Sequence, residues 1–239
     1  MIIGGILLVI QYLHDRGINY PTGSAYELDV VDYYEIAPAT ILEDLNLGKT
    51  SVFQPTDQSS TVTVTPNYFD SFPWSQSDYL LVSDALNKLK SKESSDWKVY
   101  GMIFNQSCQN ELAGFDSAEI TYFEYYKQQE SYRVHQIDIY PSSGTVSFME
   151  KEPFERPLFG LKNINLNLLF VSADAAVQKA EEKGGKEFRL QLNNACKIIV
   201  VSKPSTGGNN WVVSYLANHS IDAFEIHINL YTGWYKISL

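Results

Sequence analysis

Four histidines and two cysteines are the side chains of this 239-residue chain best suited to bind a metal ion or to act as base and nucleophile. The histidines are His14, His135, His219 and His227, and none lies in a His-Glu-x-x-His motif, which would place two zinc ligands on one helix face. A metal site needs several such side chains to converge, and the spacing shows no convergence. We therefore predict no metal and no cofactor, and we expect each histidine to lie on the surface or to be a hydrogen-bonded strand residue.

The motifs of covalent and acid–base catalysis are absent from the sequence. No Gly-x-Ser-x-Gly nucleophile turn occurs, and the glycine-rich segment STGGNN at 205–210 lacks the Lys-Ser/Thr pair of a phosphate-binding loop. Glu119 and Glu124 are five residues apart in a predicted strand, so their carboxylates would point to opposite faces. We therefore predict no catalytic residue and no enzymatic activity. The alternative, an enzyme of an unfamiliar type, requires a deep pocket in which ionisable groups converge.

Cys108 and Cys196 could form a single disulfide. Two cysteines can pair in an oxidising compartment, but their Cα atoms must lie within about 7 Å of each other. The sequence gives no such distance. The alternative is two free thiols, each kept from one ancestral position that was duplicated.

Aromatic side chains, 13% of the residues, are the remaining candidates for a binding surface. Most of them alternate with other residues in short runs, a pattern that is typical of strands. Some of them could form an exposed binding face: Tyr122, Tyr126, Trp211, Tyr215 and Trp234. The alternative is that they pack a sheet against a helix, because alternation always produces one face that can be buried.

The elements that would position these side chains occur twice in the same order. Each half contains a helix, strands and a final hairpin: 75–92, 97–105, 118–127 and 132–150 in the first, and 172–185, 188–194, 197–204, 209–218 and 222–239 in the second. The cysteines are 88 residues apart (196 − 108), and the hairpin glycines Gly144 and Gly233 are 89 apart (233 − 144). This nearly constant offset indicates duplication. We therefore predict an α+β fold of two tandem α-β-β-β units, each a helix packed on an antiparallel sheet.

The second half resembles the PepSY domain family through DAAVQKAEEKGGKEFRL and FEIHINLYTGWYKI, and the first half resembles it more loosely through SDALNKLKS and VHQIDIYPSSGTVSF. The layout also resembles uncharacterised membrane-anchored bacterial proteins with two such copies. The resemblance implies a module without catalytic residues that works outside the cytoplasm. It also implies a role like that of protease propeptides, which are thought to inhibit metalloproteases. The chain departs from the family at Asn229 and Tyr140, where an Asp often precedes the hairpin turn.

The predicted domain boundaries follow changes in composition. Residues 1–13 form an apolar anchor or signal-like segment whose true start could lie upstream, 14–73 a stalk or linker with one short helix at 38–48, 74–151 the first repeat, 152–171 a linker and 172–239 the second repeat. The uncharged run at 1–13 would be only about 20 Å long as a helix, whereas a hydrocarbon core is about 30 Å thick. It is therefore the end of a membrane helix, a short signal segment or, alternatively, a buried helix.

The charge balance narrows the choice of partners. The chain carries 18 Lys and Arg against 28 Asp and Glu, for a net charge of −10, and it lacks the basic face that nucleic-acid binding needs. We predict a non-catalytic binding or regulatory module outside the cytoplasm, attached to the membrane by its N-terminal segment. Its partner would be a protein or another component of the cell envelope. The alternative function is that of an inhibitor-like regulator of an envelope metalloprotease.

Overall fold

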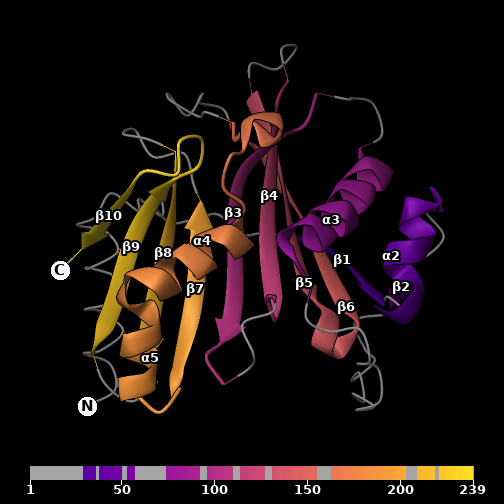
Figure 1. Cartoon of the computed structure of the whole chain (residues 1–239). Helices are drawn as coiled ribbons and strands as arrows, with labels where there is room; N and C mark the ends of the chain where they lie inside the picture. Colours follow the sequence, from indigo (N-terminus) through magenta and orange to yellow (C-terminus); the bar gives the residue numbers. More distant parts are fainter. Residues whose placement is uncertain are drawn as a thin grey trace, which may run out of the picture.

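Ten strands of the described chain join a single antiparallel sheet (Figure 1). The computed structural model describes residues 29–35, 38–49, 53–56, 74–91, 96–109, 114–126, 131–154, 163–202, 209–218 and 221–238. The strands are β1 (Asp29–Glu35), β2 (Gln54–Thr56), β3 (Lys98–Ser107), β4 (Ser117–Tyr126), β5 (Ser131–Tyr140), β6 (Thr145–Phe154), β7 (Cys196–Ser202), β8 (Asn210–Ala217), β9 (Ala223–Asn229) and β10 (Tyr235–Ser238). Their order across the sheet is β10-β9-β8-β7-β3-β4-β5-β6-β1-β2.

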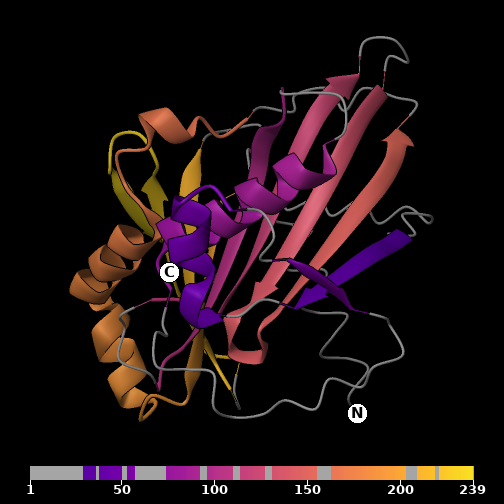
Figure 2. The same cartoon turned by 90° about the vertical axis from the view of Figure 1, so that its right-hand side faces the viewer.

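The described helices lie together on one face of this sheet (Figure 2). They are the α-helices α2 (Pro38–Asn46), α3 (Gln76–Lys90), α4 (Ala173–Ala180) and α5 (Lys186–Gln191), with the kinked turn η3 (Glu181–Gly185) joining α4 to α5. Of the two 3-10 turns, η1 (Pro141–Ser143) connects β5 to β6 in their hairpin, and η2 is Leu166–Leu168. Every second residue of the strands faces the helices, and α3 buries Tyr79, Val82 and Leu86 against these strand residues. Burial of these apolar side chains, at about 1.5–3 kcal/mol each, holds the helices on the sheet.

The centre of the sheet is the antiparallel pairing of β3 with β7, which runs from Met102 opposite Ser202 to Ser107 opposite Lys197. This pairing overturns the prediction of two tandem helix-on-sheet units, because the strands of both halves form one continuous sheet. The physical reason is that two separate units would each leave a long strand edge with unpaired backbone groups, and pairing β3 with β7 satisfies both edges. The ring of Phe104 on β3 also lies 6.0 Å from that of Trp211 on β8, so the core crosses this boundary.

A second error concerns residues 188–194, which were predicted as a strand. They form most of α5 and the turn after it, because a second helix begins directly after a kink at Lys183 and Gly184, where the backbone angles are not helical. Gly184 has φ +123°, a value that L side chains rarely adopt, and a glycine accommodates the kink without strain. The hairpin turns were predicted correctly, with Gly144 at φ +64° and Gly233 at φ +69°.

The region predicted as a stalk belongs partly to the sheet. Strand β1 pairs with β6 and β2 pairs with β1, so 29–35 and 54–56 form one edge of the sheet. Between them lies α2, where the sequence predicted a short helix, and Gly48 follows it at φ +75°. The predicted linker at 152–171 likewise begins inside β6, which ends at Phe154.

The predicted apolar anchor at 1–13 lies outside the described residues. Among the helices that are described, none combines the length and the apolar composition that crossing a membrane requires.

The first turns of α3 and α4 bind each other. Asp174 of α4 accepts a hydrogen bond from the Gln76 backbone N–H at 3.1 Å, and the Gln76 side chain accepts one from the Ala173 backbone N–H at 2.5 Å. Each helix also has a serine N-cap, Ser75 and Ser172. Burial raises the pKa of Asp174. These bonds fix the two helices relative to each other at the centre of the covered face.

Candidate functional site

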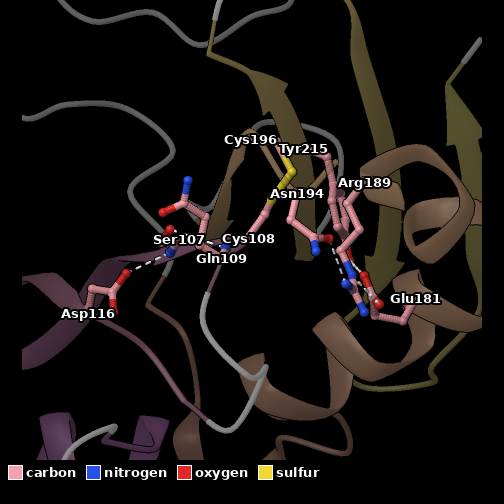
Figure 3. Close-up of a disulfide and its surroundings, with 9 residues drawn as sticks. All are labelled: Ser107, Cys108, Gln109, Asp116, Glu181, Arg189, Asn194, Cys196 and Tyr215. Carbon is pink, nitrogen blue, oxygen red and sulfur yellow. Dashed lines mark hydrogen bonds and ion pairs between the residues drawn. A yellow bond between two sulfur atoms is a disulfide. The ribbon is translucent and has the colours of Figure 1, made fainter. Parts of the chain in front are cut away.

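A disulfide joins Cys108 to Cys196 at one end of the β3–β7 pairing (Figure 3). Their Cα atoms are 5.3 Å apart, and the Cys108 N–H donates to the Cys196 carbonyl at 3.1 Å. Both residues are at most 2% exposed. Of the two alternatives that the sequence left open, the structure has the disulfide.

The pairing follows from strand direction and not from matched repeat positions. In antiparallel strands the end of one meets the start of the other, and Cys108 directly follows β3 whereas Cys196 begins β7. The register of this pair, with Ser107 opposite Lys197, continues by one step to place the two cysteines opposite each other. The two cysteines are therefore not equivalent positions of a repeat, as their offset of 88 residues suggested, since strand β3 precedes Cys108 whereas helix α5 and a turn precede Cys196.

A polar network lies beside the disulfide and holds η3, the kinked turn between α4 and α5 (Figure 3). Glu181 accepts hydrogen bonds from the Tyr215 hydroxyl at 2.7 Å and from Arg189 Nε at 2.8 Å. Arg189 Nη1 also donates to Asn194 at 2.9 Å. Burial, followed by the hydrogen bond and charge of Glu181, raises the pKa of Tyr215. Each of these four side chains is bonded to another member of the network, so the network connects β8 to η3, α5 and the turn after α5.

A groove of about 570 Å³ lies on the covered face between α3 and the segment 163–166. Its volume falls in the range of about 300–1,000 Å³ that is usual for ligand sites. The described residues that line it are Ser77, Leu80, Leu81 and Asp84 of α3, Trp97, Lys98 and Val99 at the start of β3, Tyr122 of β4, and Asn163 to Leu166. The far wall is fixed to the sheet, because the Ile164 N–H donates to the Val99 carbonyl at 2.8 Å. The groove is thus a preformed feature with an apolar floor and a polar rim.

The ionisable groups at the groove do not converge. Asp84 pairs with Lys88 one turn along α3 at 2.5 Å, and Lys98 lies 3.5 Å from Asp96. At the floor, the Tyr122 hydroxyl forms a 2.8 Å hydrogen bond with Ser83, and burial raises its pKa. This arrangement suits binding by contact and hydrogen bonding.

His135 forms a buried polar cluster behind Trp97. Its Nδ1–H donates to Asn87 Oδ1 of α3 at 2.6 Å, and its ring stacks on Trp97 with centroids 3.8 Å apart. Its Nε2 lies 4.0 Å from Glu150 of β6. Burial, and then the charges of Arg133 and Lys90, lower the pKa of His135 to about 3.

The carboxylates and cations around His135 come from several strands and from α3. Arg133 lies 4.0 Å from Glu124 and 3.6 Å from Glu150, and Lys90 of α3 pairs with Asp32 of β1. Burial raises the pKa of Glu124. Since Trp97 also lines the groove, the neutral imidazole supports one groove wall. The sequence pattern gave no signal for this cluster, because its members are far apart along the chain.

The predicted aromatic binding face is wrong for three of its five members. Tyr122, Trp211 and Tyr215 are at most 3% exposed and pack between sheet and helices, which was the alternative. Trp211 also donates its Nε1–H to the Val171 carbonyl at 2.8 Å. Trp234 is 69% exposed, and the side chain of Tyr126 lies outside the described residues. Burial follows from strand register: residues opposite one another across the strands share the face that the helices cover.

Two of the four histidines, His135 and His227, lie within the described residues. His135 is a hydrogen-bonded strand residue, as predicted, and His227 forms a 2.8 Å contact with Glu225 on the same strand. His14 and His219 lie outside the described residues. Within the part of the chain that the structure describes, no three His, Cys, Asp or Glu side chains are placed to hold a metal ion together.

Comparison with known proteins gives no relative from which a function could be transferred. No family model, curated protein or solved structure matches this chain. The resemblance to the PepSY family therefore stays a prediction.

Proposed function

We propose that this chain is a non-catalytic binding or regulatory module that works outside the cytoplasm, held at the membrane by its N-terminal segment. The observation that carries the proposal is the buried Cys108–Cys196 disulfide, which pairs both cysteines of the chain. Structural disulfides form and persist in oxidising compartments and are rare in the cytosol.

The groove beside α3 is the binding surface in this proposal. Its walls are fixed before any ligand arrives, by the Ile164–Val99 backbone bond on one side and by the packing of α3 on the other. A preformed surface loses little conformational entropy on binding. The partner is a protein or another component of the cell envelope, and nucleic acid is disfavoured by the net charge of −10.

The compartment is tested by trapping thiols in the cells that make the protein. Acid-quenched lysate is alkylated before and after reduction, and the native full-length chain is read by mass spectrometry. We expect Cys108 and Cys196 to be labelled only after reduction, and the chain to be cleaved by protease added outside the inner membrane. Two free thiols in the quenched lysate, or full protection from the protease, would refute the proposal.

The groove is tested by crosslinking the full-length chain to envelope extract. Ser77 is exposed and lines the groove, so Ser77→Arg should reduce capture of a saturable partner without unfolding α3. The matched control is Ser142→Arg, an exposed serine in the hairpin turn outside the groove. Equal capture by both variants would show that the groove is not the binding surface.

A further inference from the structure

Trp234 is a large apolar side chain displayed on the protein surface. It is 69% exposed, whereas Trp74 and Trp211 are at most 1% exposed. Exposing an indole forgoes the burial energy that the other tryptophans gain. A single exposed apolar residue needs no explanation by itself, but Trp234 is distinguished by the turn that holds it and by the hollow beside it.

The turn that carries Trp234 is tightly held. Asn229 Oδ1 accepts hydrogen bonds from the backbone N–H groups of Tyr231 and Thr232 and from the Thr232 hydroxyl, all within 3.1 Å. The Asn229 N–H donates to the Trp234 carbonyl at 2.7 Å. From α4, Lys179 Nζ donates to the Gly233 carbonyl at 2.7 Å. The indole is thus presented from a fixed backbone, which lowers the entropic cost of binding through it.

A hollow of about 290 Å³ adjoins this indole, and we call it the Trp234 hollow. The described residues that line it are Asn210, His227, Trp234, Lys236 and Ser238. Strand register shows that it lies on the face opposite the helices, because Trp211 and Ile228 are buried against them and the lining residues alternate with these. Its volume lies just below the lower limit of about 300 Å³ that is usual for ligand sites.

The polar groups of the hollow can donate and accept hydrogen bonds in several directions. Asn210 uses its Oδ1 to accept from Asn229 at 3.4 Å, so its amide N–H groups are directed elsewhere. Ser238 offers a hydroxyl, and Lys236, two residues earlier on β10, offers an exposed ammonium group. Glu225 orients the His227 ring at 2.8 Å. An aromatic face with a ring of amide, hydroxyl and ammonium groups matches a ligand that has one apolar face and many hydroxyls.

We propose that the Trp234 hollow binds a saccharide, with the C–H face of a sugar ring stacked on the indole and the ring hydroxyls bonded to Asn210, Ser238 and Lys236. The proposal rests on the function proposed above and deepens it, since it names the ligand class of a binding module that works at the cell envelope. The site is separate from the groove beside α3, because the two lie on opposite faces of the sheet.

The proposal is tested by calorimetric titration of the full-length chain with three soluble probes: cellohexaose, chitohexaose and hexagalacturonate. They present an unmodified neutral sugar, an N-acetylated sugar and an acidic sugar, so the probe that binds shows which class of sugar the hollow accepts. We expect saturable binding of at least one probe, and a loss of affinity of roughly tenfold or more in Trp234→Ala, because a central aromatic anchor carries much of such binding energy.

The control variant is Tyr140→Ala, which removes an aromatic side chain that is 46% exposed on the other half of the sheet. It should bind like the unaltered protein, and both variants should melt at the same temperature as the parent. Absence of binding to all three probes, or binding that Trp234→Ala leaves unchanged, would overturn the proposal. Such a failure would leave the proposed function in place if the groove still captured a protein partner.

Discussion

Removal of the disulfide should destabilise the protein by an amount that loop entropy predicts. The bond closes a loop of 88 residues. With that length, the chain-entropy relation gives about 4.6 kcal/mol at 25 °C. This is a large fraction of the roughly 5–15 kcal/mol that stabilises an ordinary domain. For a chain of this size the melting temperature should fall by roughly 9–18 °C.

The double variant Cys108→Ala/Cys196→Ala is the appropriate perturbation, because both sulfurs are buried and a single substitution would leave a reactive thiol. Urea unfolding followed by circular dichroism measures the free energy, and the slope with urea should increase because the unfolded chain without the loop exposes more surface. The reduced parent protein is the control and should match the double variant. A loss below about 1 kcal/mol, with an unchanged slope, would refute the reasoning that the bond acts on the unfolded chain.

Three further predictions concern buried contacts. Because the folded pKa of His135 is about 3, below the unfolded value of 6.5, this residue favours folding above pH 6.5. That contribution, up to about 4–5 kcal/mol, is lost as pH falls from 6.5 to 3. The variant His135→Gln should therefore show a flatter dependence of unfolding free energy on pH than the parent. An equally steep profile in the variant would contradict this. Gly185→Ala places a Cβ 2.7 Å from the Tyr215 ring and 2.9 Å from the Ala180 carbonyl. It should therefore cost about 1–3 kcal/mol in urea unfolding, whereas exposed Lys186→Ala should change little. Gln76→Leu leaves the Ala173 N–H without its acceptor and should cost about 1–3 kcal/mol; a melting temperature equal to the parent's would show that the contact between the two helix ends contributes nothing.

Local patterns in the sequence were sufficient for the strands and turns. Alternation in 118–127 and 132–150 predicted β4, β5 and β6, and the glycines at 144 and 233 marked turns that do adopt positive φ. The helix predicted at 75–92 corresponds to α3, which begins at Gln76 behind the N-cap Ser75. These features depend on residues near one another in the chain.

The arrangement in space could not be predicted in the same way. The pairing of β3 with β7 depends on backbone groups, which leave no trace in side-chain pattern. Phe188, Leu190 and Leu192 alternate as in a strand, yet they lie on or just after α5. The strand prediction failed because alternation over only about five residues does not distinguish a strand from a short helix. Burial of Tyr122 and Trp211 followed from which face the helices cover, and the cluster around His135 required strands from across the sheet to be placed first.

The sheet order also determines how the protein would respond to tension along its chain. The N-terminal strands β1 and β2 form one edge and the C-terminal strand β10 the other, so a pull on the two chain ends would peel strands from the edges inward, one hydrogen bond at a time. The disulfide stops that peeling, since the chain between Cys108 and Cys196 cannot lengthen while the bond is intact. With 88 residues closed off at roughly 3.4 Å each, about 300 Å of contour is withheld from extension. A protein with this topology would yield at its edges under load and retain β4, β5 and β6 inside a covalent loop.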